Sequence, residues 1–415
     1  MVRGGRVGAL FFALMLAPET SAFAQSEEAA DYHTPRYEAA GFPLLAGSSD
    51  VGVKTGAVGT LKRFEEGVRP YRWNVDLLLA ASFKEGPTAI EIAQQSYILS
   101  FDVAGLGDGQ VRSGSHLRYT RTINQNYFGV GNASSSQLPA SVEGQPGRYF
   151  QFVAPELEVR QLTRIRVHRP IDAVITTIYR YEAPETYPGS KLAQDGARVL
   201  GLHSLSLLSL GGGVIYDTRD NEPFPSSGMR HLVGAKYVQG FPVDDQVRYG
   251  QAGGFFAGYV PLGGGFVYAA RVAVDLQFGN VPFFDLYRAG PFESYEMIGG
   301  STGIRGVPVG RYLGPIKVLA NQEVRLIFAR FSVFEQNFRV GGNVLFDVGR
   351  LWSDYSFRAR EDGSGVGLRW GAGGGIYLGW GQASIFRIEA AYSTEAVAAN
   401  PSFPIGLYVN DGVAF

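Results

Sequence analysis

The sequence contains no cysteine, few charged residues and no long apolar run beyond its N-terminus. Without cysteine there are no disulfides, no thiolate metal ligands and no thiol nucleophile. Charged residues make up 18% of the chain and the formal net charge is −1, so no overall field attracts it to nucleic acid. No later segment approaches the ~18 consecutive apolar residues that indicate a transmembrane helix.

Glycine and aromatic side chains, by contrast, are abundant. There are 56 glycines among 415 residues, and Phe, Trp and Tyr together make up 13%. The aromatic content and the low net charge exclude a disordered chain. Because Gly, Tyr and Phe are poor helix formers, the composition also argues against an all-α protein and favours β-structure.

The first residues have the layout of a secretory signal peptide. Arg3 and Arg6 precede an apolar run over residues 7–17, and Ala22-Phe23-Ala24 supplies a small-x-small cleavage site. These features predict a signal peptide over residues 1–24. The alternative is an uncleaved anchor, but a spanning helix needs ~20 apolar residues. We therefore expect an exported protein that is either soluble or crosses a membrane as a closed β-barrel.

Residues 25–50 are polar, and we interpret them as a flexible N-terminal lead. From Val51 onward apolar and polar residues alternate, as in Phe266–Phe278, so each run has one apolar and one polar face. The runs are ~10–13 residues long, which suits a tilted membrane-spanning strand, whereas strands of a soluble sandwich usually have ~5–6 residues. The soluble all-β fold is the alternative. We predict an all-β fold in which residues 51–415 form a single transmembrane antiparallel β-barrel of outer-membrane type.

About sixteen strands fit this length. Their predicted centres lie near Ala57, Leu78, Leu99, Tyr119, Leu157, Ile175, Leu210, Val233, Phe255, Val272, Tyr295, Val324, Val344, Leu368, Ile388 and Leu407.

Several motifs, in order along the chain, resemble the bacterial surface antigen superfamily, whose sixteen-stranded outer-membrane barrels include the BamA and TamA assembly proteins. The motifs are Tyr127–Asn132, Tyr216–Asn221, Gly299–Tyr312, Asn321–Arg325, Phe346–Trp352 and Gly365–Trp370. The third carries a hydrophobic-Arg-Gly-aromatic tetrad in the family, here Ile304-Arg305-Gly306-Val307, with Val307 in place of the aromatic residue. Residues 25–50 are too few for even one polypeptide-transport-associated domain, so the resemblance is to a member lacking these periplasmic domains.

The resemblance implies that the loop bearing Arg305 and Gly306 folds back into the barrel and pairs with acids on the inner wall. Alternation independently places Glu323 and Asp347 on the polar faces of their strands. A planar guanidinium holds two carboxylates well, and glycine next to it lets the loop bend. We expect Arg305, Gly306, Glu323 and Asp347 to form a structural lock in the lumen. The alternative is that the acids are solvated lumen residues and Arg305 lies on an external loop.

No catalytic, cofactor-binding or metal site is expected. The histidines are His33, His116, His168, His203 and His231, and they form neither a His-Glu-x-x-His pair nor a partner for a Gly-x-Ser-x-Gly elbow. Arg305 itself stays protonated and cannot act as a base. We therefore expect no enzyme and no cofactor.

By resemblance, the protein is expected in the outer membrane of a Gram-negative bacterium, assisting insertion or transport of protein or lipid. The alternatives are a passive pore for small solutes and a structural or surface-binding barrel. Expected partners are outer-membrane lipids, the outer-membrane assembly machinery during biogenesis and an unidentified periplasmic partner or client, but no nucleic acid. Phe415 at the C-terminus is expected to be part of the assembly signal. A weak seam is expected between the strand near Ala57 and the strand near Leu407, where Gly and Pro disfavour pairing.

Overall fold

The computed structural model describes residues 35–415, apart from residues 49, 69–70, 87, 108, 143–144, 223, 243, 334–335, 381–383, 400–403 and 412–414. The signal peptide predicted over residues 1–24 lies outside the described residues. The described chain is all-β, and sixteen antiparallel strands close into one barrel, as the alternating pattern predicts.

Each barrel strand pairs with its neighbours along the chain, and β1 also pairs with β19 to close the ring. The strands are 7 to 20 residues long, long enough to cross a bilayer when tilted. They are β1 (Arg36–Ser48), β2 (Gly52–Phe64), β3 (Trp73–Glu85), β4 (Ile90–Leu106), β5 (Val111–Asn126), β6 (Gln151–His168), β7 (Ile171–Glu182), β9 (Leu205–Asp217), β10 (Gly228–Gly240), β11 (Asp244–Gly263), β12 (Phe266–Asn280), β15 (Ile316–Val333), β16 (Gln336–Trp352), β17 (Arg369–Trp380), β18 (Ser384–Tyr392) and β19 (Ile405–Asp411).

Three short strands lie outside this ring order. The two-residue strand β8 (Glu185–Thr186) pairs with β6. Strands β13 (Arg288–Ala289) and β14 (Tyr295–Glu296) pair only with each other, in the connection between β12 and β15.

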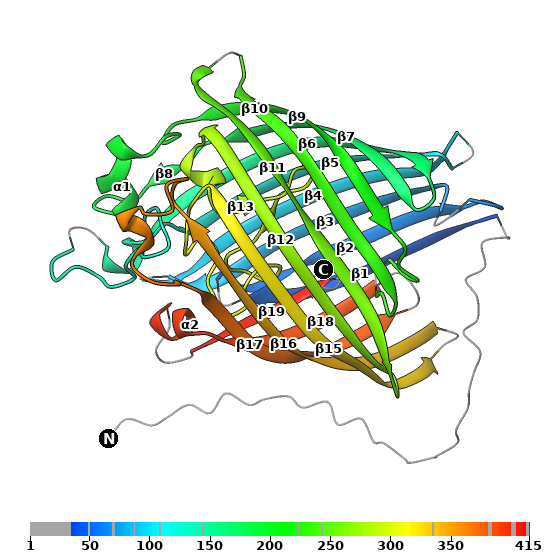
Figure 1. The fold of residues 1–415 in the computed structure, drawn as a ribbon. Coiled ribbons are helices and arrows are strands. Elements are labelled where there is room, and N and C mark those ends of the chain that lie inside the picture. The colour runs from blue at the N-terminus through cyan, green and yellow to red at the C-terminus, as the bar shows by residue number, and fades with distance from the viewer. Residues whose placement is uncertain are drawn as a thin grey trace, which may run out of the picture. The chain divides into compact units, whose positions relative to one another are not determined.

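The two ends of the barrel differ in the length of their connections. Residues 127–150, 183–204, 281–315, 353–368 and 393–404 are long connections that all lie at one end, which we call the long-loop end. They contain every described helix: α1 (Lys191–Asp195), α2 (Thr394–Ala399), and the 3₁₀ turns η1 (Pro146–Arg148), η2 (Gly196–Arg198), η3 (Phe283–Asp285) and η4 (Arg360–Asp362). Figure 1 shows α1 and α2 together at this end, on the left. In outer-membrane barrels long loops are extracellular and short turns periplasmic, so the opposite, short-turn end corresponds to the periplasm. None of the helices in the described part of the chain has the length and apolarity to span a membrane.

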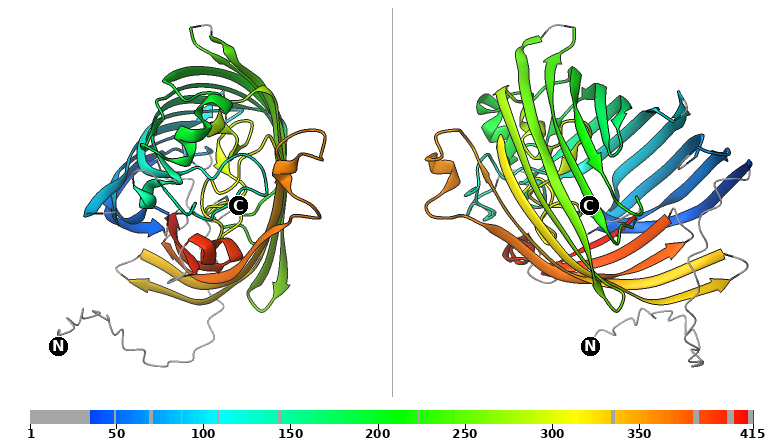
Figure 2. Two further views of the ribbon diagram at one scale, coloured as in Figure 1. Left: turned by 90° about the vertical axis from the view of Figure 1, so that its left-hand side faces the viewer. Right: turned by 45° about the vertical axis from the view of Figure 1, so that its right-hand side comes forward.

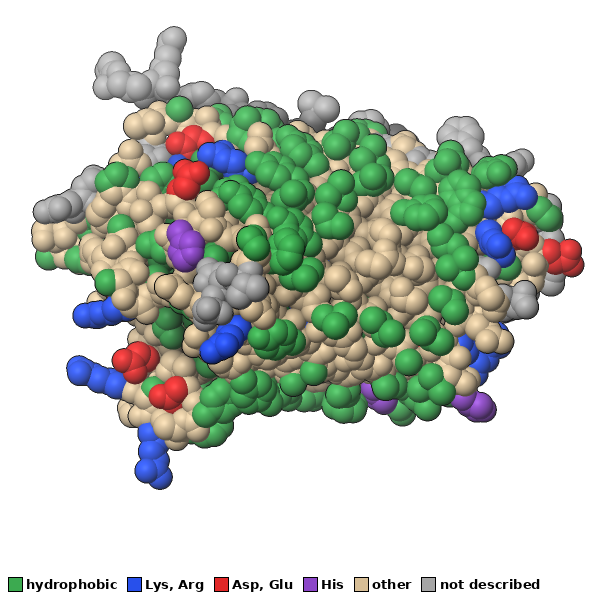
Figure 3. Space-filling view, turned by 90° about the horizontal axis from the view of Figure 1, so that it is seen from above, with side chains coloured by type: hydrophobic (Ala, Val, Ile, Leu, Met, Phe, Trp, Pro, Cys, Tyr) green, Lys and Arg blue, Asp and Glu red, His purple; other side chains and the backbone are tan. Residues whose placement is uncertain are grey.

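Strand faces alternate as a bilayer-spanning wall requires. Along β7, Ile175 points outward and is 52% exposed, whereas Asp172 and Thr176 point inward and are buried. On the face that Figure 3 shows, hydrophobic side chains are spread over the middle of the outer surface, and charged side chains gather toward its two ends. Because the bilayer core cannot solvate charges, this arrangement fits a lipid-facing band between two polar rims.

The first strand corrects one expectation. Residues 25–50 appear from the sequence to be a flexible lead, but β1 occupies residues 36–48 and pairs with β2 along 13 positions. The barrel therefore begins before Val51. The segment hides its strand character because Gly41, Pro43 and several alanines interrupt the alternation. Proline is tolerated in a strand at a sheet edge, and β1 lies at the seam of the barrel.

A second correction concerns the predicted strand centred on Tyr295. This residue lies in β14, inside the barrel, and not in the wall. Its neighbours are apolar because they pack against the inner wall rather than against lipid. The prediction omitted β1 and included a strand at Tyr295 that is not in the wall. The predicted total of sixteen strands is therefore correct, although one of the sixteen predicted strands is wrong. Leu368 lies one residue before β17, in the preceding connection.

Candidate functional site

The connection 281–315 between β12 and β15 enters the lumen and packs against the inner wall. In the end-on view of Figure 2, yellow segments of this connection lie within the ring of strands. Met297, Ile304 and Val307 are fully buried and contact Leu319 and Leu351 of the wall in one apolar cluster. Burial of this cluster holds the loop inside, because exposing it again costs ~25 cal/mol per Å². Val307, which departs from the aromatic residue of the family motif, fills this cluster.

Arg305 lies at the centre of this loop and is fully buried. Its Nε and Nη2 donate to the two carboxylate oxygens of Asp347 on β16, each at 2.8 Å. Its Nη1 donates to Glu389 Oε1 on β18 at 3.0 Å and also to Glu323 on β15. The guanidinium thus joins three neighbouring regions of the wall through charge-assisted hydrogen bonds, the stronger kind of hydrogen bond in proteins.

The acids around Arg305 are themselves paired with other groups. Arg325 Nε donates to Glu323 Oε2 at 2.7 Å, and Arg387 lies 3.1 Å from Glu389. Asn321 Nδ2 donates to Asp347 Oδ1 at 2.7 Å. Three buried carboxylates therefore face three buried guanidiniums, and a fourth buried guanidinium, that of Arg271, donates to Asn321. Buried charges are tolerated when they are paired and hydrogen-bonded in this way.

Glu389 is part of this network and is absent from the sequence prediction. Alternation along β18 puts Arg387 and Glu389 on one face with the buried Ile385 and Ala391, so the polar pair could have been assigned to the lumen. The family motif does not extend to β18, and no sequence spacing links Glu389 to Arg305.

Gly306 fastens the same loop to the last strands. Its N–H donates to the Tyr408 hydroxyl on β19 at 2.9 Å, and its carbonyl accepts from Ser393 Oγ at 2.8 Å. Its φ is +96°, and a Cβ there would lie 3.0 Å from the backbone of Tyr392. Glycine is therefore required here both by the backbone conformation and by the close approach to the wall.

The C-terminal residue also lies inside the barrel. The Phe415 ring packs beside Tyr259 and Ala269 of the inner wall. It stands 5.3 Å from the Arg325 guanidinium and 5.1 Å from that of Arg271, within cation–π range. Figure 2 shows the C-terminus within the ring of strands. Nothing in the structure tests the expected role of Phe415 in assembly, which stays a prediction.

The seam between β1 and β19 is the shortest pairing in the ring. Among the described residues it consists of Gly47 with Val409 and Ser48 with Tyr408. The neighbouring pairings, β1 with β2 and β18 with β19, extend over 13 and seven positions. The expected seam has the correct last strand, but its first strand is β1 and not the strand near Ala57, which is β2.

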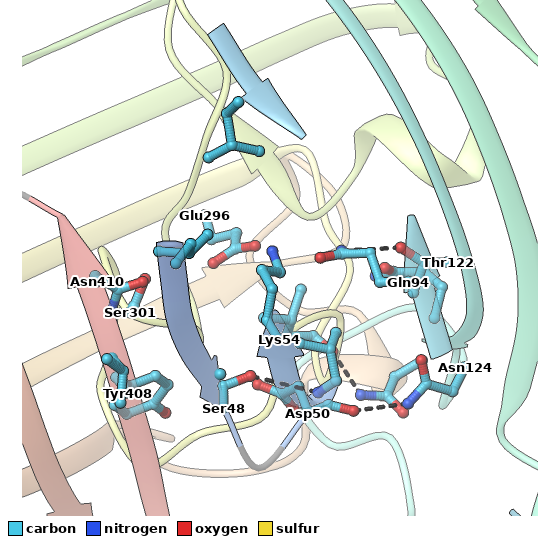
Figure 4. Close-up of a pocket in the computed structure, with 18 of the residues that line it drawn as sticks. Ser48, Asp50, Lys54, Gln94, Thr122, Asn124, Glu296, Ser301, Tyr408 and Asn410 are labelled. Carbon is cyan, nitrogen blue, oxygen red and sulfur yellow. Dashed lines mark hydrogen bonds between the residues drawn. The ribbon is translucent and has the colours of Figure 1, made fainter. Parts of the chain in front are cut away.

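A polar cavity of about 330 Å³ lies directly behind the seam. Ser48, Lys54 of β2, Tyr408 and Glu296 of the loop line it, and Figure 4 shows Lys54 and Glu296 extending into the same space. Asp50, in the turn between β1 and β2, also lines the cavity.

Two acids of this seam cavity have raised pKa values. Burial raises the pKa of Asp50 to about 6, although Lys84 opposes the rise. Burial, together with the charge of Asp50, raises the pKa of Glu296 to about 7. Both groups therefore titrate near neutral pH, which is uncommon for carboxyl groups.

His116 has a contact that a Ser-His catalytic pair would also show, because its Nδ1 lies 2.9 Å from Ser100 Oγ. The two residues face each other on β4 and β5, where cross-strand pairs commonly hydrogen-bond. Among the described residues, no group of three or more His, Asp and Glu side chains has the geometry to hold a metal ion.

Comparisons with known proteins agree with this architecture. A family model described as the Omp85 superfamily domain matches residues 109–401. Among solved structures, the chain is similar to BamA from Haemophilus ducreyi, with a TM-score of 0.56 and 15% identity, covering 91% of this chain and 70% of that one. It is also similar to CdiB from Escherichia coli, with a TM-score of 0.55 and 10% identity, covering 90% of this chain and 62% of that one. No curated protein sequence matches the chain.

The barrel, its lipid-facing band and its inward loop define an outer-membrane β-barrel protein of the kind found in Gram-negative bacteria. The family match covers well over half of the chain. The chain belongs to the Omp85 superfamily, and the resemblance seen in its motifs is confirmed.

Proposed function

We propose that this barrel assists the insertion or translocation of protein or lipid at the outer membrane through an opening between β1 and β19. The observation that supports this is the seam of two residue pairs. Opening the ring at this seam separates two residue pairs, whereas opening it between β1 and β2 separates 13, so the backbone bonds lost are fewest at the seam. The ring would therefore open most easily at this seam, and the cavity behind it, with polar side chains in its lining, lies beside the backbone groups that would become unpaired.

We also propose that Arg305, Gly306, Glu323 and Asp347 act as a structural lock on the inward loop. The fork of Arg305 on Asp347 and the bond from Gly306 to Tyr408 support this role. The loop and its ion pairs occupy the lumen where a passive pore needs open space, which disfavours a channel for small solutes.

Cross-linking the seam tests the proposal, and the absence of cysteine makes the test clean. Ser48→Cys with Tyr408→Cys places two thiols at paired positions, where Cα atoms of antiparallel strands lie ~4.5–5.5 Å apart and a disulfide can form. Leu45→Cys with Thr55→Cys is the matched control, because it joins β1 to β2, away from the seam. Purified variants in phosphatidylcholine vesicles are given an unfolded outer-membrane barrel as client. Client folding is followed by heat-modifiable gel migration.

We expect wild-type vesicles to accelerate client folding over empty vesicles. The oxidised seam variant should lose this acceleration, and reductant should restore it in the same sample, which controls for the loss of the Tyr408 hydroxyl. The control pair should be active in both states. Equal acceleration of client folding by the oxidised and the reduced seam variant would show that the activity does not require the seam to open. If the barrel conducts ions equally well in the oxidised and reduced states and does not accelerate client folding, the passive pore is favoured.

A further inference from the structure

A second cavity, of about 530 Å³, lies in the lumen away from the lock and the seam. Inward-facing residues of β4, β5, β6 and β10 form its wall, and residues 290–293 of the inward loop close one side. Arg112 lies near the start of β5, Arg230 near the start of β10, and Arg219 in the connection from β9 to β10. All three positions are at the short-turn end, so the cavity is nearest the periplasm.

Arginines dominate the lining of this cavity, which we call the arginine cavity. Five of them line it: Arg112, Arg160, Arg164, Arg219 and Arg230. The carboxylates in its lining number three: Asp102, Glu222 and Glu293. The lining therefore carries an excess of positive charge, although the molecule as a whole has a formal net charge of −1.

Four of these arginines have a carboxylate partner. Arg112 lies 2.9 Å from Asp102 and 3.4 Å from Glu222. Arg160 lies 3.3 Å from Glu293. These contacts account for every carboxylate in the lining.

Two of the four use acids outside the lining. Arg219 lies 2.7 Å from Asp217. Arg164 lies 2.7 Å from Asp172, which it shares with Arg166, also at 2.7 Å. One carboxylate thus serves two guanidiniums at this point of the wall.

Arg230 is the exception. In the described part of the chain its guanidinium has no carboxylate within ion-pair distance, and its nearest assigned contact is the Phe255 ring at 5.4 Å. Arg219 and Arg164 repel the Arg230 guanidinium, whereas Asp217 and Glu293 attract it. Each of these two acids also lies within ion-pair distance of another arginine: Asp217 of Arg219, and Glu293 of Arg160. Because Arg230 only shares these charges and has no direct ion pair of its own, a bound anion would add a charge-assisted contact.

We propose that the arginine cavity binds a phosphate-bearing ligand that reaches it from the periplasmic end, with Arg230 as the principal contact. The guanidinium fork matches the geometry of phosphate oxygens, and Arg112 and Arg219 flank the same space. The volume is within the range of small-molecule sites, about 300–1,000 Å³, and exceeds what a lone phosphate fills. Phe255, Leu162 and Leu232 add apolar surface for an attached organic group. The ligand is either a free phosphorylated compound or a phospholipid headgroup, and this inference is independent of the insertion role.

Isothermal titration of the full-length barrel in phosphatidylcholine nanodiscs, with inorganic pyrophosphate as the probe at fixed ionic strength, tests the proposal. Wild type should bind pyrophosphate. Arg230→Gln should weaken binding at least tenfold, since it removes a charge-assisted fork. Arg198→Gln is the matched control: it removes an exposed arginine of η2 at the other end, and should bind as wild type does. Arg230→Lys, which keeps the charge but not the fork, should fall between.

Glu222→Gln is a variant whose expected effect, tighter pyrophosphate binding, cannot result from misfolding. Glu222 is exposed and pairs only weakly with Arg112, so its neutralisation adds net positive charge to the cavity and should tighten pyrophosphate binding. A damaged barrel cannot give that gain.

Repeating the titration with phosphatidylglycerol in the nanodiscs separates the two sources of the ligand, a free phosphorylated compound and a phospholipid headgroup. Weaker apparent pyrophosphate binding assigns the site to a lipid headgroup, and unchanged binding assigns it to a free phosphorylated compound. Absence of pyrophosphate binding by wild type, or equal binding by Arg230→Gln, overturns the proposal.

Discussion

Replacing Arg305 by Ala tests the lock most directly. The substitution removes the side-chain bonds to Asp347, Glu389 and Glu323 at once. Glu323 keeps Arg325 and Glu389 keeps Arg387 as ion-pair partners. Among the described residues, Asp347 then has no guanidinium within ion-pair distance, in a place with no solvent exposure.

The structure sets the expected magnitude. An exposed ion pair contributes ~0–1 kcal/mol, whereas removing one partner of a buried pair costs ~3–5 kcal/mol. The sequence alone predicts a loss of unfolding free energy between these two limits, because a lumen lined by polar residues is expected to contain water. Since Arg305 is fully buried, as is Asp347, we expect a loss near the buried limit, about 3–5 kcal/mol in the free energy of unfolding. Asn321 and the Arg305 backbone N–H still serve Asp347, which keeps the cost from rising further.

Urea unfolding and refolding in lipid vesicles, followed by heat-modifiable migration, measures this loss. Adding Asp347→Asn to Arg305→Ala removes the carboxylate that has lost its guanidinium and should recover part of the stability. Arg305→Lys keeps the charge but cannot form the fork, and should lose less than Ala. Protease sensitivity of residues 281–315 should rise with the loss of stability. A cost below 1 kcal/mol, with no recovery from the second substitution, would refute the buried lock.

Three further predictions concern the loop, the C-terminus and the seam cavity. Gly306→Ala should cost about 1–3 kcal/mol of unfolding free energy, because it adds backbone strain and wall contact. Gly109→Ala, which has a similar φ of +77° but no neighbour within 4 Å, should cost less in the same assay. Deleting Phe415 should lower the yield of folded barrel in outer-membrane fractions while export continues; an unchanged yield excludes it from the assembly signal. The raised pKa values of Asp50 and Glu296 mean that the folded barrel binds more protons than the unfolded chain, whose carboxyl pKa is about 4. Melting temperature should therefore fall as pH rises from about 4 to 7, and Glu296→Gln should flatten that fall.

The wall of the barrel was predictable wherever lipid dictates the pattern. A strand with one face on hydrocarbon must alternate, so Phe266–Phe278 and its counterparts are visible in the sequence. Strand β1 was not, because an edge strand with Pro43 and small residues carries little of this pattern. The segment around Tyr295 was predicted as a strand of the wall although it is not one, because its apolar residues face the inner wall instead of lipid.

The site was predictable only in its local part. Glu323 and Asp347 follow from strand parity, and Arg305 from its motif. Glu389 and Tyr408 join the network through closure of the ring, which brings β18 and β19 beside the loop although they lie far along the chain. No local sequence pattern predicts that Glu389 and Tyr408 lie beside the loop. The arginine cavity is hidden for the same reason, because its arginines come from different strands.

The contacts of the inward loop leave the seam between β1 and β19 free of loop bonds that cross it in the described part of the chain. Arg305 binds acids of β15, β16 and β18, and Gly306 binds Tyr408 of β19. Earlier residues of the same loop are paired with other strands: Arg288 lies 2.7 Å from Glu182 of β7, and Glu293 lies 3.3 Å from Arg160 of β6. Toward β2 the loop faces Lys54 across the seam cavity. Separation of β1 from β19 breaks two residue pairs but none of these loop bonds. An opening of this kind, as we propose it, would therefore leave the bonds of Arg305 and Gly306 intact while β1 parts from β19.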